Sequence, residues 1–124
     1  MNSNLVEFGG LLAPQSYVNA TDDEKSDICN GCGTSGWKGK VVPETMWGLD
    51  ISEACQRHDW MYHYGTTKKD KELADLVFLR NLVRIINREG GWLKWPRRYR
   101  AMTYYNFVAD FGDEAFWDNK QVML

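Results

Sequence analysis

The chain has 124 residues, a length that fits one domain with one hydrophobic core, so we expect a single domain over residues 1–124. The formal net charge is −2, so no basic excess indicates a nucleic-acid partner. Three cysteines are too few for a disulfide-dense secreted scaffold, and no apolar run approaches the roughly 20 residues of a membrane span.

The first part of the chain has little periodicity. Residues 1–28 are weakly patterned, and a short apolar turn between Leu5 and Leu12 is interrupted by Gly9-Gly10. Residues 29–48 contain a glycine cluster, which predicts an ordered loop. The first residues lack the basic start and apolar run of a signal peptide, so we expect synthesis in the cytoplasm.

A helix is predicted from near Asp50, where Glu53 lies three residues on as in a capping box, to a stop at Gly65. The apolar residues of this segment share one face with His58. On the same spacing, Trp60 and His63 point away from the core.

A second helix is predicted from about Asp70 to Glu89, with Gly90-Gly91 as its stop. Asp75 lies within the apolar stripe of this helix, where a carboxylate is costly unless it has a partner. We expect the two helices to face each other and to pair His58 with Asp75. An ion pair between Asp75 and Arg57 is the simpler alternative.

A third helix is expected from Pro96, at its first position, to about Phe111, with Gly112 as a candidate interruption. Three such helices predict an all-α domain.

His58-Asp59 is the most informative pair in the chain. Side chains adjacent on one helix point about 100° apart, so one can act as a base while the other holds a cation beside it. The glycine-rich segment Cys29–Gly36 can supply the backbone carbonyls that a hard cation prefers. The combination indicates calcium-assisted hydrolysis.

These residues also form a recognisable pattern. The run Cys55-x-x-His58-Asp59-x-x-Tyr62 resembles the active-site helix of the phospholipase A2 superfamily, and Asp75 followed three residues later by Phe78 resembles its second motif. The segment from Gly31 to Gly36 resembles the calcium loop of that family. The match covers roughly residues 29–82 and fits small phage and bacterial members better than venom or pancreatic enzymes. It implies two core helices that carry the histidine and the aspartate, a calcium loop and a C-terminal helix.

The resemblance implies a role for each catalytic residue. His58 would be the general base that takes a proton from water, and Asp75 would fix its tautomer. Tyr62 would hold Asp75, and the backbone N–H of Gly33 would stabilise the oxyanion. The implied reaction is calcium-dependent hydrolysis of the sn-2 acyl ester of a glycerophospholipid to a lysophospholipid and a free fatty acid.

The resemblance also implies the metal site. Ca²⁺ would be bound by the carboxylate of Asp59 and by three backbone carbonyls, those of Gly31, Gly33 and Ser35. A disulfide would join Cys32 to Cys55 and leave Cys29 as a free thiol. Because cytosolic calcium is too low for a weak site, activity would follow release or delivery, as in a phage or toxin context.

Two other functions fit parts of the pattern. Cys29-x-x-Cys32 with Cys55-x-x-His58 forms a possible Cys₃His zinc set, which is typical of a structural or interaction module. That set leaves Asp59, Tyr62 and Asp75 unexplained. A catalytically inactive protein of the same fold that only binds lipid is the second alternative.

An aromatic and basic cluster follows the second helix, formed by Trp92, Lys94, Trp95, Arg97, Arg98 and Arg100. Aromatic rings at headgroup depth and cations on phosphates suit an anionic phospholipid membrane surface. We therefore expect peripheral contact with membranes. The alternative is that this loop and helix start pack on the core.

Overall fold

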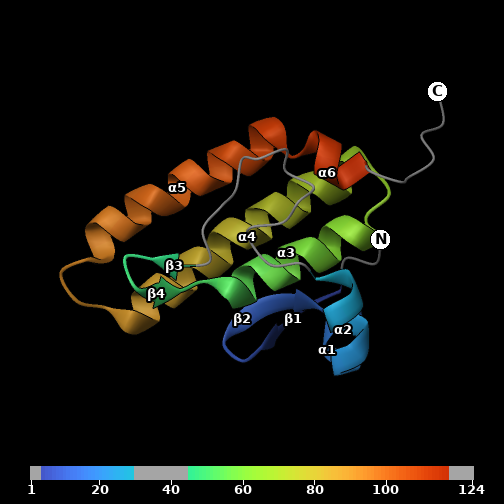
Figure 1. Cartoon of the computed structure of the whole chain (residues 1–124), viewed down its shortest axis with the longest axis horizontal. Coiled ribbons are helices and arrows are strands. Elements are labelled where there is room, and N and C mark those ends of the chain that lie inside the picture. The colour runs from blue at the N-terminus through green and yellow to red at the C-terminus, as the bar shows by residue number, and fades with distance from the viewer. Residues whose placement is uncertain (1–3, 30–44, 118–124) are drawn as a thin grey trace.

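Three long helices form the body of the molecule. The computed structural model describes residues 4–29 and 45–117. Helices α3 (Ser52–Tyr64), α4 (Lys68–Glu89) and α5 (Lys94–Phe111) lie side by side, and α4 packs against both others (Figure 1). The short connections over residues 65–67 and 90–93 allow only antiparallel neighbours.

The helix that carries His58 begins two residues later than the sequence predicts. The predicted capping box is absent, because Ile51 is the residue at the N-cap and makes no side-chain cap. The carboxylate of Asp50 accepts a hydrogen bond from the backbone N–H of Ser52 at 2.8 Å. The helix ends before Gly65, as predicted, but Gly65 has a φ of −70° and is not left-handed. A Cβ at Gly65 would lie 2.7 Å from the ring of Phe116, so close packing requires glycine here.

The helix that carries Asp75 begins at Lys68, two residues before its predicted start. Thr67 caps it: its side-chain oxygen accepts from the N–H of Asp70, whose carboxylate accepts from the N–H of Thr67, each at 3.1 Å. This reciprocal pair satisfies two backbone donors that would otherwise lack partners. The helix ends at Gly90, whose φ of 68° favours glycine.

Helix α5 begins at Lys94 rather than Pro96, and Gly112 separates it from α6 (Asp113–Trp117). The predicted interruption at Gly112 is therefore confirmed. The mostly helical fold agrees with the sequence, but the described residues also include two small sheets that the all-α prediction lacked.

The first sheet is an antiparallel hairpin of β1 (Leu5–Phe8) and β2 (Leu11–Pro14). Gly9 and Gly10 make its turn with φ values of 63° and 85°. Two short helices follow, α1 (Gln15–Asn19) and α2 (Asp22–Ile28).

The second sheet pairs β3 (Thr45–Met46) with β4 (Leu49–Asp50). Each strand is too short to show the alternation by which strands are detected in a sequence.

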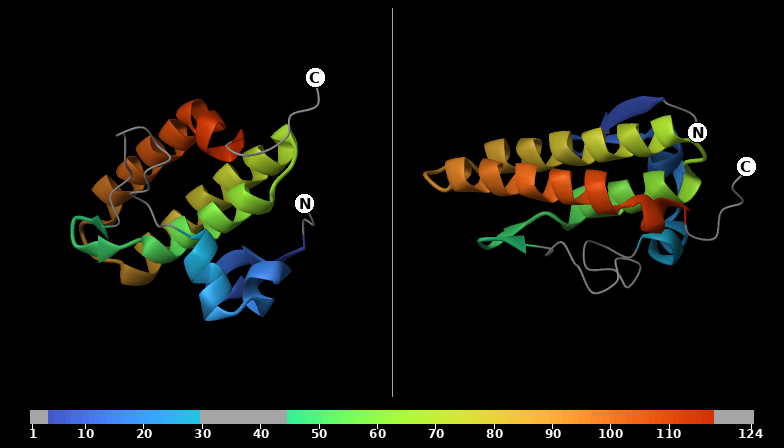
Figure 2. Two further views of the ribbon diagram at one scale, coloured as in Figure 1. Left: turned by 45° about the vertical axis from the view of Figure 1, so that its right-hand side comes forward. Right: turned by 90° about the horizontal axis from the view of Figure 1, so that it is seen from above.

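A buried asparagine joins the first hairpin to the helices. Asn81 of α4 accepts a hydrogen bond from the N–H of Leu12 at 2.7 Å and donates one to its carbonyl at 2.9 Å. Its amide thus takes the place of a neighbouring strand for β2, which packs against α3 and α4 (Figure 2). None of the helices in the described ranges is long and apolar enough to cross a membrane.

Candidate active site

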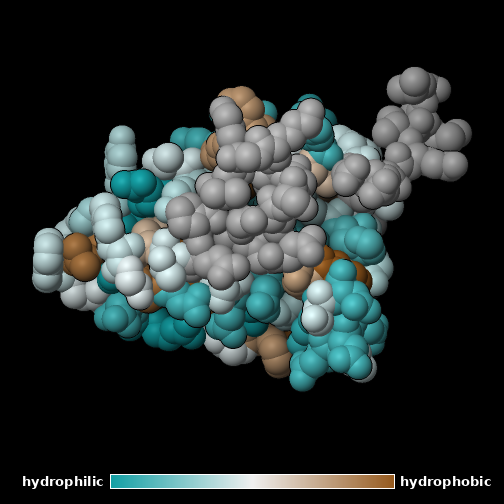
Figure 3. Space-filling model, viewed as in Figure 1, coloured by the Kyte–Doolittle hydropathy of each residue, from teal (hydrophilic) through white to brown (hydrophobic). Residues whose placement is uncertain are grey.

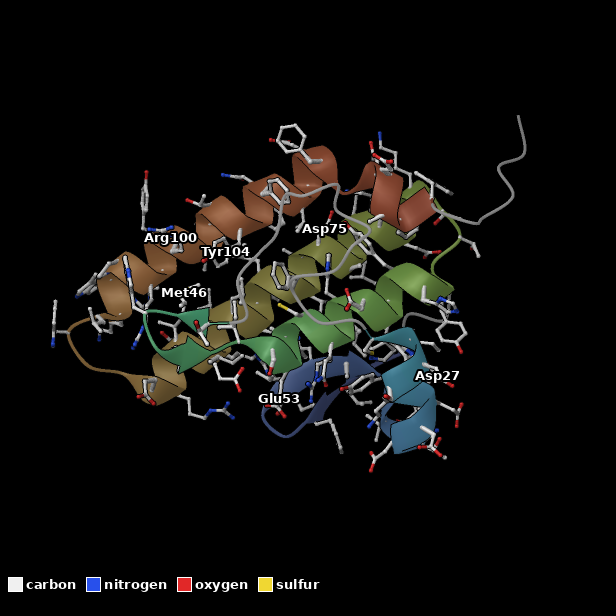
Figure 4. All side chains as sticks on the ribbon, viewed as in Figure 1. Asp27, Met46, Glu53, Asp75, Arg100 and Tyr104 are labelled. Atoms are coloured by element: carbon white, nitrogen blue, oxygen red, sulfur yellow. The ribbon has the colours of Figure 1, made fainter. Side chains whose placement is uncertain are left out.

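The predicted contact between His58 and Asp75 is present. His58 on α3 and Asp75 on α4 are buried, with 4% and 2% of their surface exposed, and Nε2 lies 2.8 Å from Oδ1. Figure 4 shows Asp75 among the long helices. An ionised carboxylate can only accept a hydrogen bond, so Nε2 carries the proton and Nδ1 carries the lone pair. This is the tautomer that a general base acting through Nδ1 requires.

Tyr62 meets the same carboxylate oxygen. Its hydroxyl donates to Oδ1 of Asp75 at 2.6 Å, as the sequence resemblance implies. The His58 ring also lies between two aromatic rings, with centroids 4.1 Å from Tyr62 and 4.7 Å from Phe78. Burial first, and then the charge of Asp75, raise the pKa of Tyr62, so its hydroxyl stays a donor. The imidazole is therefore fixed both by a hydrogen bond and by packing.

A lysine that the sequence analysis missed completes the cluster. Lys71, one turn before Asp75 on α4, is 5% exposed, and its Nζ donates to Oδ2 of Asp75 at 2.8 Å. The alternative partner, Arg57, is wrong: its guanidinium donates to the carbonyls of Phe8 and Glu53 instead. The four-residue spacing between Lys71 and Asp75 is the sequence signal that could have identified the lysine.

Burial and hydrogen bonds set the protonation states of Asp75 and His58. Burial alone would raise the pKa of Asp75, but hydrogen bonds from His58, Lys71 and Tyr62 outweigh it and hold that pKa below 3.8. For His58, burial lowers the pKa below 6.5, Lys71 acts in the same direction, and Asp75 opposes both. At pH 7 the site therefore contains a neutral imidazole and a carboxylate.

Asp59, the predicted carboxylate ligand of calcium, follows His58 on α3 and is half-buried. Its charge contributes to raising the pKa values of Cys29 and Tyr62. The carbonyl ligands predicted at Gly31, Gly33 and Ser35, and the predicted oxyanion donor Gly33, lie outside the described residues. One carboxylate with backbone carbonyls is an all-oxygen set that suits Ca²⁺. Within residues 4–29 and 45–117, no three His, Cys, Asp or Glu side chains are grouped for a metal.

The cysteines bear on the zinc alternative. Cys29 is free, and its Sγ donates to the carbonyl of Gln56 at 3.2 Å. Burial, helped by the charge of Asp59, raises the pKa of this thiol to about 12. Zinc needs a thiolate, whereas the thiol of Cys29 donates its proton to Gln56, and this contact does not favour the Cys₃His set. Cys55 is buried, and its predicted disulfide partner Cys32 lies outside the described residues, so that pairing stays a prediction.

The aromatic cluster after α4 is exposed rather than packed on the core. Trp92 and Trp95 are 82% and 65% exposed, Tyr99 on α5 is 77% exposed, and Trp47 in the β3–β4 turn is 50% exposed. These four rings are called the aromatic tip below. The guanidinium groups of Arg98 and Arg100 lie over the rings of Trp95 and Trp47, respectively.

One predicted member of this surface is wrong. Arg97 is buried, and it donates to the carbonyls of Met46 at 3.2 Å and Trp47 at 2.7 Å. It thereby fastens the β3–β4 turn to α5. Figure 3 shows that the end of the molecule formed by this turn and the start of α5 is pale, in contrast to the hydrophilic surface over α1 and α2.

No protein-family model matches the chain, and comparisons with curated proteins and with solved structures find no match either.

Proposed function

We propose that the chain is a calcium-dependent hydrolase of glycerophospholipid acyl esters, with a phospholipase A2-like active site. The observation that carries the proposal is the buried hydrogen bond between Nε2 of His58 and Oδ1 of Asp75, with Tyr62 on the same oxygen. A neutral imidazole oriented by a carboxylate is what a general base needs at neutral pH. The adjacent Asp59 adds a carboxylate for a cation.

The proposed reaction has two steps. A water molecule loses a proton to Nδ1 of His58 while its oxygen attacks the carbonyl carbon of the ester. Asp75 stabilises the imidazolium through Nε2. The tetrahedral intermediate then breaks its bond to the glycerol oxygen, which takes the proton back from His58. A fatty acid and a lysophospholipid leave, and the neutral base is restored.

Asp59 would hold Ca²⁺ together with the carbonyls of Gly31, Gly33 and Ser35. The ion, when bound, polarises the ester carbonyl and offsets the charge of the oxyanion. The N–H of Gly33 would donate to the same oxyanion.

We further propose that the aromatic tip touches the phospholipid surface. Tryptophan and tyrosine favour the membrane–water interface, and Lys94, Arg98 and Arg100 lie beside the rings to meet anionic headgroups. From Asp75 to the end of α4 at Glu89 the helix rises by about 20 Å. A molecule whose tip and active site both reach lipid must therefore lie with its long helices along the membrane.

The test is the release of fatty acid from phospholipid vesicles with calcium and with a chelator. We expect release that depends on calcium, and calorimetric calcium binding that Asp59→Asn removes together with activity. Asp110→Asn, which changes an exposed aspartate of α5, is the matched control and should keep both. No calcium-dependent release by the wild-type chain, or an unchanged calcium isotherm in Asp59→Asn, would contradict the proposal.

A further inference from the structure

Lys71 is unusual because a lysine is rarely buried unless its charge has a partner. Its ammonium group is surrounded by oxygen atoms from three helices. It donates to Asp75 Oδ2 on α4 at 2.8 Å and to the carbonyls of Val108 and Ala109 on α5 at 3.1 and 3.3 Å. A carboxylate oxygen of Asp113, at the start of α6, lies 3.7 Å away.

Part of this arrangement is explained by the fold alone. The carbonyls of the last turn of a helix have few partners within the helix, although that of Val108 also accepts from the N–H of Gly112 at 2.9 Å. A cation there also meets the negative end of the helix dipole. Such a role does not require Asp75. Yet the contact with Asp75 is the shortest that Nζ makes, and it joins the lysine to the residue that orients His58.

The two oxygens of Asp75 have different partners. Oδ1 accepts from His58 and Tyr62, and Oδ2 accepts from Lys71. Rotation of the carboxylate out of its present plane would break these bonds, because each oxygen is held by its own donors. Without the bond at Oδ2, only the groups on Oδ1 would oppose that rotation.

We propose that Lys71 is a positioning residue, which locks the carboxylate of Asp75 so that Oδ1 faces Nε2 of His58, and which ties this carboxylate to the end of α5. The inference rests on the proposed hydrolytic function. Loss of Lys71 would leave the carboxylate of Asp75 freer to turn. His58 could then also adopt the tautomer that carries its proton on Nδ1, and in this tautomer Nδ1 cannot accept a proton from water.

The first test compares Lys71→Met, which keeps an unbranched side chain but removes the cation, with Lys69→Met, which changes an exposed lysine of the same helix. Groups that orient a metal-bound histidine typically contribute ~10- to 100-fold to activity, and we use the same scale for a group that acts on His58 through Asp75. We expect kcat to fall by about that factor in Lys71→Met, with KM changed less than about threefold, because the orientation of the base acts on the chemical step. An unchanged kcat would overturn the proposal.

A double-mutant cycle separates positioning from general stability. If Lys71 acts through Asp75, adding Lys71→Met to Asp75→Asn should lower kcat by less than about twofold beyond Asp75→Asn alone. If the two losses multiply, Lys71 acts by another route and the proposal is wrong. All variants are compared at a temperature well below their unfolding midpoints.

A third measurement does not need catalysis. The ¹⁵N shifts of the His58 ring, recorded near pH 8 where the imidazole is neutral, report which nitrogen carries the proton. We expect the Nε2–H form in the wild type and a mixture in Lys71→Met; an unchanged spectrum would overturn the proposal. If the wild-type chain releases no fatty acid, the proposed function fails and this spectrum alone decides the role of Lys71. If Lys71→Met does not fold, Lys71→Gln takes its place in each test.

Discussion

Asp75 is the residue through which the candidate site is organised, since it contacts His58, Tyr62 and Lys71 together. The contact between Asp75 and His58 was predictable from the sequence, because both residues fell on apolar helix faces. The lysine was not predicted, because its burial depends on how the end of α5 closes over α4. The four-residue spacing indicates a pair between Lys71 and Asp75, but it does not show that the lysine is buried.

The pH dependence of hydrolysis tests the environment of His58. If His58 is the proposed base, activity needs the neutral imidazole and should fall as pH drops through the pKa of His58. Burial places that pKa below 6.5, and calcium at Asp59 would lower it further. Asp75→Asn removes the charge that raises the pKa, so the midpoint of the kcat profile should move to still lower pH and the rate should fall.

The measurement is the pH–rate profile of both proteins at saturating calcium, over a range in which each stays folded. Asp110→Asn is the control for loss of a carboxylate elsewhere. A wild-type midpoint above 6.5 would mean that burial does not dominate the pKa of His58. A midpoint that does not move in Asp75→Asn would mean that Asp75 does not govern the titration of His58.

At the scale of the elements, the long helices were predictable within a few residues because their apolar periodicity extends over several turns. The N-terminal hairpin was not predicted, and the surroundings of Trp60 were predicted wrongly for that reason. Trp60 was expected on the outer face of α3 but is buried, with its Nε1 donating to Ser16 at 3.1 Å and its ring edge-on to Tyr17. The segment from β2 to α1 covers a second face of α3, whereas His63 is exposed as predicted.

The attachment of the hairpin gives a stability prediction. Asn81→Ala would leave the partly buried N–H and carbonyl of Leu12 without this partner, at a cost of about 2–4 kcal/mol in the free energy of unfolding. Asn87→Ala, which changes an exposed asparagine of the same helix, should cost less than about 1 kcal/mol. Urea unfolding followed by circular dichroism measures both. Equal effects of the two substitutions would show that Asn81 does not hold β2.

For the whole molecule, the aromatic tip and the candidate site lie apart along the helices. Figure 4 shows Arg100, whose guanidinium group lies over the ring of Trp47, at some distance from Asp75. The sequence identified the cluster by composition, but whether its rings faced solvent or the core depended on the path of the loop after α4. The buried Arg97 and the exposed Trp92 show that neighbours in the cluster have opposite surroundings.

Replacing the exposed rings should separate lipid binding from chemistry. Trp92→Ala and Trp95→Ala should together weaken binding to anionic vesicles by at least about tenfold, because inserted aromatic surface is lost. Hydrolysis of a short-chain phospholipid below its micelle concentration should change less than about twofold, since His58 and Asp75 are untouched. Vesicle co-sedimentation measures the binding, and hydrolysis is measured both on vesicles and on the dispersed short-chain substrate. Equal losses on vesicles and on the dispersed substrate would contradict a role of the tip in lipid contact.

The central claim is that His58 is the base of a calcium-dependent phospholipid hydrolase, and the chain contains its own control. His58 and His63 lie on the same helix, one buried against Asp75 and the other exposed. Fatty-acid release from vesicles at saturating calcium should fall by ~100-fold or more in His58→Gln and stay near the wild-type rate in His63→Gln. If His58→Gln is folded and keeps more than about a tenth of the activity, the base is another group and the account is wrong.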